Sequence, residues 1–499
     1  AEGDITLGHI ESQSGDIYVE SRTGRITDGL LTSSGETNTE WNIKTAGGVS
    51  VIANEGNLNA ILWSPSYVGN GETADDTTNT IDIAASSVNQ MQAPDGVTVN
   101  VGDGVDNIAF TGDLHAERDV VMNLGSANFT MSEGTTLSAE GDIRISTTGS
   151  VTLTNMQVID GKTIDLDVGG DLVGLTNADG SANLYGSTVR LNVGGSIGTS
   201  DQAVSIDAQT DAAGQNGAIQ FIATPSDAHL EITTPNDGTN RRTVEIGSDS
   251  DDWVVGNALN VTATHADLDI LGDISAAHVS IDAQAGALTM TDGRTITSHG
   301  DVILSGSAGL AVSNIIGDTT AGTTQTITMR SDLGNISEVT ANESANVVTA
   351  GALTLDGQSI AVLGSGDLDV DVGTMDITTT SSNAGVANIE SLSSQTVVNG
   401  SDVTGILTLT VDQGDLTLAG DLSAGGIMFN LADSSASDME RDIVINDGVR
   451  LSSLGAATLL ATGDVLLSDI NVATGDLTIV ADGEVRDNAA GVDANVTMG

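Results

Sequence analysis

Short runs in which inward and outward positions alternate recur along the whole chain, and residues 463–485 show this most clearly. The sequence there is GDVLLSDINVATGDLTIVADGEV, in which a Gly-Asp pair twice precedes a run of about five residues. Val465 and Leu467 in the first run, and Leu477 and Ile479 in the second, stand two positions apart. A period of two places each pair on one face of a β-strand. The stretch therefore predicts two short strands that each begin at a Gly-Asp corner.

The same pattern begins at Gly3-Asp4 and continues to the last residues of the chain. The clearest internal repeat aligns residues 163–172 (TIDLDVGGDL) with residues 188–197 (TVRLNVGGSI), so that the aliphatic residues and the Gly-Gly pair coincide. No segment keeps a helical period of about 3.6 residues, and no helix-capping residues precede apolar stripes. We therefore expect very little helix.

A repeat of roughly 18–26 residues with two or three short strands cannot bury its apolar face alone, but stacked repeats can. Stacked coils would pair their strands in parallel at about 4.8 Å, with Gly supplying tight corners. The pattern predicts an all-β fold: a right-handed parallel β-helix of roughly 20 coils that runs through residues 1–499 as one solenoid. Residues 64–96 and 223–260, which contain the four prolines, are expected to be irregular loop insertions.

Three other all-β architectures fit less well. A left-handed hexapeptide helix needs a strict hexapeptide repeat, and a calcium-loaded β-roll needs tandem nonapeptides; neither is present. A string of immunoglobulin-like sandwiches would usually carry one core Trp per domain of about 100 residues. Trp41, Trp63 and Trp253 do not recur in that way.

Composition agrees with thin layers of small aliphatic residues, because aromatic residues make up only 2% of the 499 residues while Gly reaches 61. The 69 acidic and 14 basic residues give a formal net charge of −55, which argues against nucleic-acid and anionic-membrane partners. Repulsion among so many negative charges favours an environment with divalent cations or high salt. Cys is absent, no apolar run approaches the ~20 residues of a membrane span, and no leader is visible. We interpret the chain as a mature product or a segment of something longer.

Several phrases carry a resemblance to a known family: GDLTLAGDLSAGG at residues 414–426, the stretch 463–485, and DLDVGGDLVG at residues 165–174. They resemble filamentous-haemagglutinin-like large exoproteins of bacteria, which are β-helical adhesins and giant surface proteins. The resemblance covers most of the chain apart from residues 64–96 and 223–260. It implies a β-helical surface protein with an extracellular or cell-surface location.

Calcium is the cofactor that the acidic pattern suggests, at three groups of candidate ligands. Residues 101–109 resemble one nonapeptide of the repeats-in-toxin type, whereas the other groups are acidic residues of a loop and of an alternating strand. Ca²⁺ prefers six to eight oxygen ligands, so it could join carboxylates of adjacent coils. The alternatives are an ordinary corner and solvated acidic faces. The candidate ligands are Asp103, Asp106, Asp249, Asp251, Asp252, Asp367, Asp369 and Asp371.

Trp63, at the entry to the first irregular region, and Tyr67 within it form a candidate binding loop, since exposed Trp and Tyr often anchor interfaces. The alternative is that they cover the end of an apolar layer. Catalysis is not expected. Carboxylates are so abundant that their presence does not indicate a glycosidase or lyase site, and the six His residues lack metal-ligand spacing.

We therefore expect a structural or adhesive segment of a large extracellular bacterial surface protein, able to associate with itself into filaments or bundles. Glycan or receptor recognition through protruding loops is the alternative, with a cell-surface or extracellular glycan or protein as partner. A polysaccharide lyase or glycosidase is the least favoured function. We expect neither nucleic-acid binding nor membrane insertion.

Overall fold

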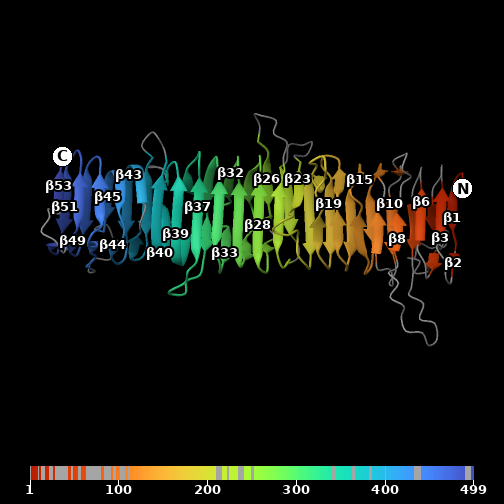
Figure 1. Ribbon diagram of the computed structural model, residues 1–499, viewed down its shortest axis with the longest axis horizontal. Helices are drawn as coiled ribbons and strands as arrows, with labels where there is room; N and C mark the ends of the chain where they lie inside the picture. The colour runs from red at the N-terminus through yellow and green to blue at the C-terminus, as the bar shows by residue number, and fades with distance from the viewer. Residues whose placement is uncertain are drawn as a thin grey trace. The chain divides into compact units, whose positions relative to one another are not determined.

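The computed structural model describes residues 113–499 except for ten short stretches and, before residue 113, residues 2–8 and the strands β2–β11 named below. The stretches outside the description are 210–215, 222–223, 234–240, 249–251, 340–343, 362–365, 381–384, 399–400, 432–439 and 489–495. The described residues form a parallel β-solenoid with no helix (Figure 1). About 16 turns are described, slightly fewer than the roughly 20 predicted for the whole chain. The right-handed sense of the coil stays a prediction.

The chain divides into two compact units, Ala1–Val261 and Thr262–Gly499, and each is a stack of coils. In the first unit three ladders of parallel strands repeat from coil to coil. One ladder contains β1 (Ile5–Leu7), β4 (Ile26–Asp28), β7 (Leu58–Leu62), β10 (Val97–Val101), β13 (Val120–Asn123), β16 (Ile143–Thr147), β19 (Thr163–Val168), β22 (Thr188–Val193), β24 (Gly217–Phe221) and β26 (Thr243–Ile246).

The second ladder of this unit contains β3 (Ile17–Ser21), β6 (Val49–Ala53), β8 (Thr80–Ile83), β11 (Asn107–Phe110), β14 (Asn128–Met131), β17 (Val151–Leu153) and β20 (Leu172–Gly174). The third contains β9 (Met91–Ala93), β12 (Leu114–Ala116), β15 (Thr136–Ala139), β18 (Asn155–Val158), β21 (Leu184–Gly186), β23 (Val204–Ala208) and β25 (Ala228–Ile232). The unit also holds β2 (Ile10–Ser12), β5 (Ile43–Thr45) and β27 (Trp253–Val254).

The second unit repeats the arrangement, with β28 (Ala258–Ala263) at the boundary. Its first coils contain β29 (Asp267–Ile270), β30 (Ile274–Ala276), β31 (His278–Ala283), β32 (Ala287–Met290), β33 (Thr295–Ser298), β34 (Val302–Gly306), β35 (Gly309–Val312), β36 (Asn314–Ile316), β37 (Thr326–Ser331) and β38 (Ile336–Glu338). Four long strands follow among shorter ones: β39 (Val347–Gly357), β40 (Leu368–Thr379), β43 (Ser401–Val411) and β45 (Leu422–Asn430). Register shifts inside β39 and β43 let one strand pair on two faces of the coil.

The remaining strands of the second unit continue the parallel ladders. They are β41 (Ala387–Ser391), β42 (Gln395–Val397), β44 (Leu416–Leu418), β46 (Ile443–Ile445), β47 (Arg450–Ser453), β48 (Ala457–Ala461), β49 (Val465–Leu467), β50 (Asp469–Val472), β51 (Leu477–Ala481), β52 (Val485–Asp487) and β53 (Val496–Met498).

The alternation that predicted the strands decides which side chains enter the core. In β19, Ile164, Leu166 and Val168 are buried whereas Asp165 and Asp167 lie outward. The offset between the two aligned repeats is the coil itself, because the six residues of β19 pair in register with the six of β22. Each inward row is therefore a column of aliphatic side chains that continues from coil to coil, so the core grows with every added coil.

Parts of both predicted insertions belong to the regular ladders. Strands β8 and β9 lie within residues 64–96 and pair in parallel with β11 and β12. Within residues 223–260, β25 pairs with β23, and β26 pairs with β24. Trp253 of β27 is fully buried and stacks on Phe221 of β24, with ring centroids 3.9 Å apart. Large aromatic side chains thus fill the core beside the second insertion.

Candidate functional site

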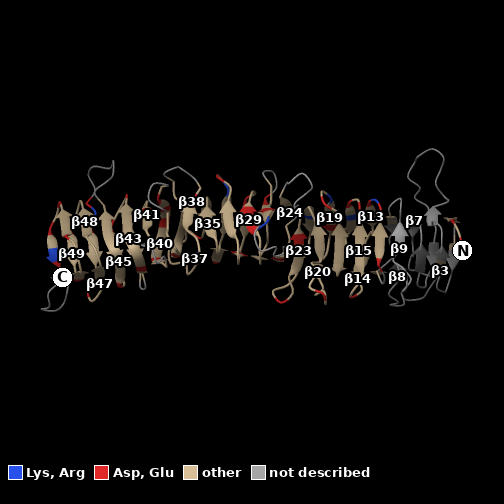
Figure 2. Cartoon of the chain, turned by 90° about the horizontal axis from the view of Figure 1, so that it is seen from above, with Lys and Arg blue, Asp and Glu red and all other residues tan. Residues whose placement is uncertain are grey.

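Asp residues at the corners of the coils accept backbone hydrogen bonds from the next coil. Oδ1 of Asp442 accepts the N–H of Asp464 at 2.6 Å, and Oδ1 of Asp464 accepts the N–H of Glu484 at 2.6 Å. We call this repeated contact the corner ladder. Figure 2 shows acidic residues at many turns of the described chain. The same contact is made by Asp113, Asp119, Asp142, Asp171, Asp227, Asp267, Asp273, Asp301, Asp415 and Asp421.

The Gly of the Gly-Asp pair makes room for the carboxylate from the preceding coil. A Cβ added at Gly463 would lie 2.1 Å from Oδ1 of Asp442, and one at Gly141 would lie 2.2 Å from Oδ1 of Asp119. Both distances are too short for a real contact, so any other residue at these two positions would have to displace the carboxylate. In these Gly-Asp pairs the carboxylate joins successive coils, whereas the glycine leaves space for the carboxylate of the preceding coil.

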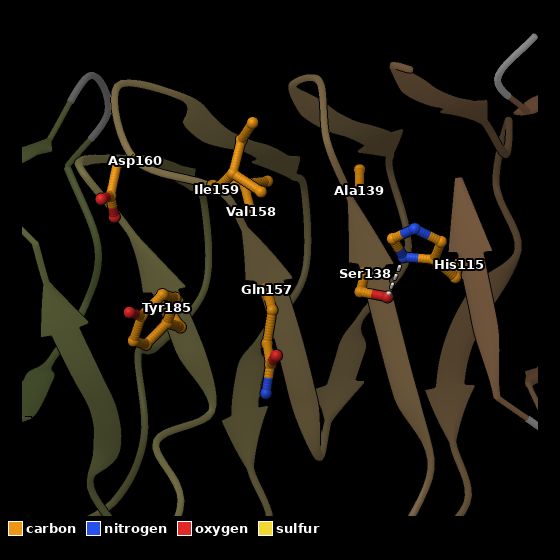
Figure 3. Close-up of a pocket in the computed structure, with 8 residues that line it drawn as sticks. All are labelled: His115, Ser138, Ala139, Gln157, Val158, Ile159, Asp160 and Tyr185. Carbon is orange, nitrogen blue, oxygen red and sulfur yellow. Dashed lines mark hydrogen bonds between the residues drawn. The ribbon is translucent and has the colours of Figure 1, made fainter. Parts of the chain in front are cut away.

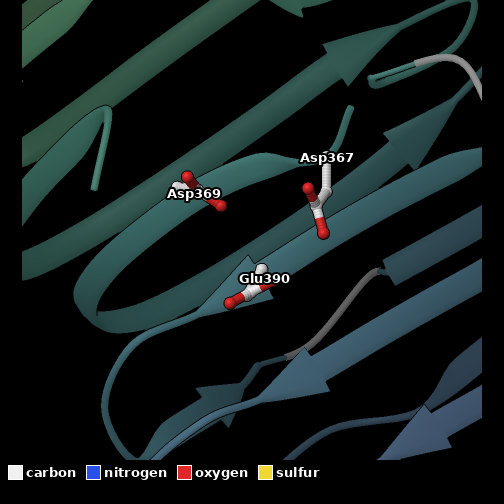
Figure 4. Close-up of side chains that lie close together, drawn as sticks. All are labelled: Asp367, Asp369 and Glu390. Atoms are coloured by element: carbon white, nitrogen blue, oxygen red, sulfur yellow. The ribbon is translucent and has the colours of Figure 1, made fainter. Parts of the chain in front are cut away.

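Three carboxylates face one another on β40 and β41, in a group that we call the acidic cluster: Asp367, Asp369 and Glu390 (Figure 4). Asp369 pairs in register with Glu390 on the next coil, and Asp367 immediately precedes β40. One oxygen from each of the three carboxylates lies within 4.8 Å of the others. Parallel stacking of an outward acidic position on another acidic position thus builds the group.

The negative charges of the acidic cluster are poorly solvated. Asp369 lies on the outward side of β40, yet it is only 2% exposed. Its backbone N–H donates a hydrogen bond to Oδ1 of Asn346 on the preceding coil, and Glu390 pairs with it on the next coil. The alternative of a solvated acidic face therefore does not hold for this residue. Burial raises the pKa of Glu390 to about 8, and the negative charges of Asp412 and Asp367 add to that rise.

Such a group can lower its free energy in two ways. It can keep a proton on Glu390, as the raised pKa implies, or it can bind a cation that offsets the charges. Three carboxylates supply up to six oxygens, and hard cations such as Ca²⁺ and Mg²⁺ bind oxygen ligands. The cluster therefore has the donor set of a divalent-cation site that joins two adjacent coils.

The structure brings together only part of the predicted metal-ligand set. Asp367 and Asp369 meet Glu390, whereas Asp371 accepts a hydrogen bond from the hydroxyl of Ser393. Asp252 is exposed just before β27. The other sequence candidates lie outside the described residues: Asp103, Asp106, Asp249, Asp251, Trp63 and Tyr67.

Glu390 was missed because it lies alone in the phrase NIES, with no neighbouring carboxylate to draw notice. Its signal was the spacing from Asp369, which falls within the range of roughly 18–26 residues expected for one coil. Aligning Leu368-Asp369-Val370 with Ile389-Glu390-Ser391 by the length of one coil would have found it.

A second buried carboxylate, Asp207 of β23, has a basic partner. Arg242 Nη1 lies 3.6 Å from Asp207 Oδ1 and also donates a hydrogen bond to Gln209. Burial raises the pKa of Asp207 to about 6, although the charge of Arg242 opposes that rise. Burial, with the charges of Asp207 and Asp160, also raises the pKa of the neighbouring Tyr185 hydroxyl.

Comparison of the chain with protein-family models, curated proteins and solved structures finds no match. Among the described residues, no helix is long and apolar enough to cross a membrane. Fold and side-chain chemistry therefore carry the functional argument.

Proposed function

We propose that the chain is a structural or adhesive segment of a large, extracellular, β-helical bacterial surface protein of the filamentous-haemagglutinin-like kind. The observation that carries the proposal is the corner ladder, in which one contact is repeated between successive coils of each unit. A fold that devotes its commonest acidic motif to joining coils is suited to holding a fixed spacing rather than to closing around a substrate.

The scaffold role is tested by small-angle scattering and electron microscopy of the purified chain. A scaffold predicts elongated, stiff particles whose cross-section is that of one coil. Compact particles, or particles that vary widely in length within one preparation, would contradict the proposal. Association into filaments or bundles, which we also propose, predicts that particle length or width grows with concentration.

Recognition of a cell-surface glycan or receptor through loops is the second candidate. The observation that favours it is the position of residues 64–79 in the sequence, between β7 and β8. Both of these strands pair within their ladders. Their removal should therefore leave the coils intact. Deleting residues 64–79 should abolish attachment to bacterial or host surfaces while strand content stays unchanged. Attachment that survives this deletion and a matching one at 234–240 would exclude the loops.

Calcium is the ion we propose for the acidic cluster, in keeping with an extracellular location. The support is the oxygen-only donor set and the shared position of Asp369 and Glu390 on adjacent coils. Bound there, the ion would join two coils directly. No catalytic step is proposed, since a scaffold needs none.

A further inference from the structure

A row of polar side chains crosses four successive coils of the first unit. His115 of β12 pairs in register with Ser138 of β15, Ser138 with Gln157 of β18, and Gln157 with Tyr185 of β21. All four are half-buried and lie outward beside one another (Figure 3). Parallel register sets the spacing of the row at about 4.8 Å per coil.

The row lines a surface cavity of about 560 Å³, which lies in the size range of small-molecule sites. Ile159 and Asp160 follow β18 directly and stand at one side of the row, both exposed (Figure 3). His115 Nδ1 lies 3.0 Å from the Ser138 hydroxyl, which in turn donates to the carbonyl of Leu114. This chain of contacts orients the His115 ring within the wall of the groove.

The composition of the groove limits the ligands that fit it. None of its eight described lining residues is Lys or Arg, and the whole chain has a formal charge of −55, so anionic ligands are disfavoured. An extended peptide cannot add to the sheet here, because β12, β15, β18 and β21 each pair on both sides. The groove instead offers hydroxyl, amide and imidazole groups beside one carboxylate and one aromatic ring.

The position of Tyr185 is informative because aromatic residues are so rare in this chain. The four Phe residues and Trp253 are buried in the core, whereas the Tyr185 ring is partly open to the groove. An aromatic ring offers a flat apolar face for the C–H face of a pyranose, and neighbouring polar groups can bind its hydroxyls. The repeat of the row is also close to the length of one sugar unit in an extended glycan.

We propose that this groove, formed by His115, Ser138, Gln157 and Tyr185, binds a neutral oligosaccharide that lies across successive coils. The Tyr185 ring stacks on one sugar, and Gln157, Ser138 and Asp160 bind hydroxyls. The site differs from the loops considered above and does not depend on the scaffold role, because a binding groove and a spacer use different surfaces of the coil.

Titration calorimetry and saturation-transfer NMR on the full chain test this with a panel of neutral hexasaccharides: β-1,4-glucan, β-1,4-mannan, β-1,4-N-acetylglucosamine, α-1,4-glucan and β-1,4-galactan. We expect at least one to bind with contacts to an aromatic ring. Tyr185→Ala and Gln157→Ala should each weaken its binding at least about tenfold, or about 1.4 kcal/mol. Tyr185→Phe should retain most of it.

Tyr18→Ala is the matched control, since Tyr18 is an exposed tyrosine on β3 of the same unit, and it should bind as the parent chain does. Ser138→Tyr fills the groove from an outward position and should abolish binding even if Tyr185→Ala fails to fold. The proposal is overturned if no hexasaccharide binds, or if Tyr185→Ala and Ser138→Tyr bind as the parent does. Preference for a sulfated glycan, a basic peptide or a polyamine would equally overturn it.

Discussion

The corner ladder and the acidic cluster use the same residue types in the same kind of stack, with opposite results. At Asp442 the next coil presents a backbone N–H, so the carboxylate gains a hydrogen bond across the junction. At Asp369 the next coil presents Glu390, so two carboxylates meet. What an acidic residue does in a parallel solenoid is decided by the group one coil away. Acidic content alone says little about ion binding.

The corner ladder is broken most severely by filling the space that glycine leaves. Gly463→Ala would place Cβ 2.1 Å from Asp442 Oδ1, and the displacement should cost about 1–3 kcal/mol. Hydrogen exchange of β46 and β49 would measure this loss as local stability. Gly426→Ala is the control, because its Cβ would meet only Ile406 Cγ1 at 3.4 Å and the Ala456 carbonyl at 3.6 Å. Equal effects of the two substitutions would show that the carboxylate does not need the space.

Calcium separates the two kinds of acidic stack. If the acidic cluster binds Ca²⁺, the ion at about 100 times its Kd should stabilise β40 and β41 by about 2.7 kcal/mol, and a chelator should remove that gain. Hydrogen exchange with and without the chelator measures it. Glu390→Gln should lose the response, whereas Asp442→Asn at the corner ladder should keep it. A calcium response that is the same in all three chains would place the ion elsewhere.

Asp207 is a third case, in which a buried carboxylate lies beside the guanidinium of Arg242 rather than a backbone N–H or another carboxylate. Its pKa is raised from 3.8 to about 6, so the folded state binds its proton more tightly than the unfolded state does. Its ionisation therefore destabilises the fold, fully above about pH 6 and not at all below about pH 3.8. This rise in the pKa of Asp207 corresponds to about 3 kcal/mol, or about 1–2 kcal/mol after discounting for solvent screening.

Stability near β23 should accordingly fall by that amount as pH rises from 4 to 7. Urea unfolding of the parent chain and of Asp207→Asn at both pH values isolates the effect, because the other carboxylates are common to both. A difference between the two chains that does not change with pH would refute the assignment.

The smallest expected effect comes from removing one acceptor of the corner ladder. Asp301→Ala loses the 2.8 Å hydrogen bond from the N–H of Thr326 and should cost about 1 kcal/mol. Asp301→Asn keeps an oxygen in place and should cost less than half as much. Asp332→Ala, in the exposed turn after β37, is the control for loss of charge. If Asp332→Ala costs as much as Asp301→Ala, charge rather than the hydrogen bond matters.

Much of the fold can be predicted from the sequence because the alternation of buried and exposed side chains is set within each strand. Alternation of Ile164, Leu166 and Val168 with polar residues depends only on the period of the strand, and the offset from β19 to β22 was visible in the Gly-Gly pairs. The stretch 463–485, predicted to contain two strands, spans one coil: Val465 pairs with Val485, which follows Gly483 at the next corner. The alternation of aliphatic and polar residues can be recognised without any knowledge of the neighbouring coils.

The sites follow less well because they depend on register between coils of unequal length. The coil that brings Asp369 to Glu390 is shorter than the coil that brings β19 to β22. Turns that differ by a few residues decide which side chains share a column. The groove could not be predicted for the same reason. Its four residues follow one another at unequal intervals along the chain: His115, Ser138, Gln157 and Tyr185. None of these four residues belongs to a motif in the linear sequence.

The Gly-Asp corner also bears on how such a chain can change over evolutionary time. At Asp142, Asp442 and Asp464 the corner both presents a carboxylate to the following coil and accepts one from the preceding coil, so these junctions are nearly the same. A duplicated or deleted segment that begins and ends at a corner brings both halves of the contact with it. Recombination at these corners can therefore lengthen or shorten the protein by whole coils, while a cut elsewhere in the coil leaves mismatched faces.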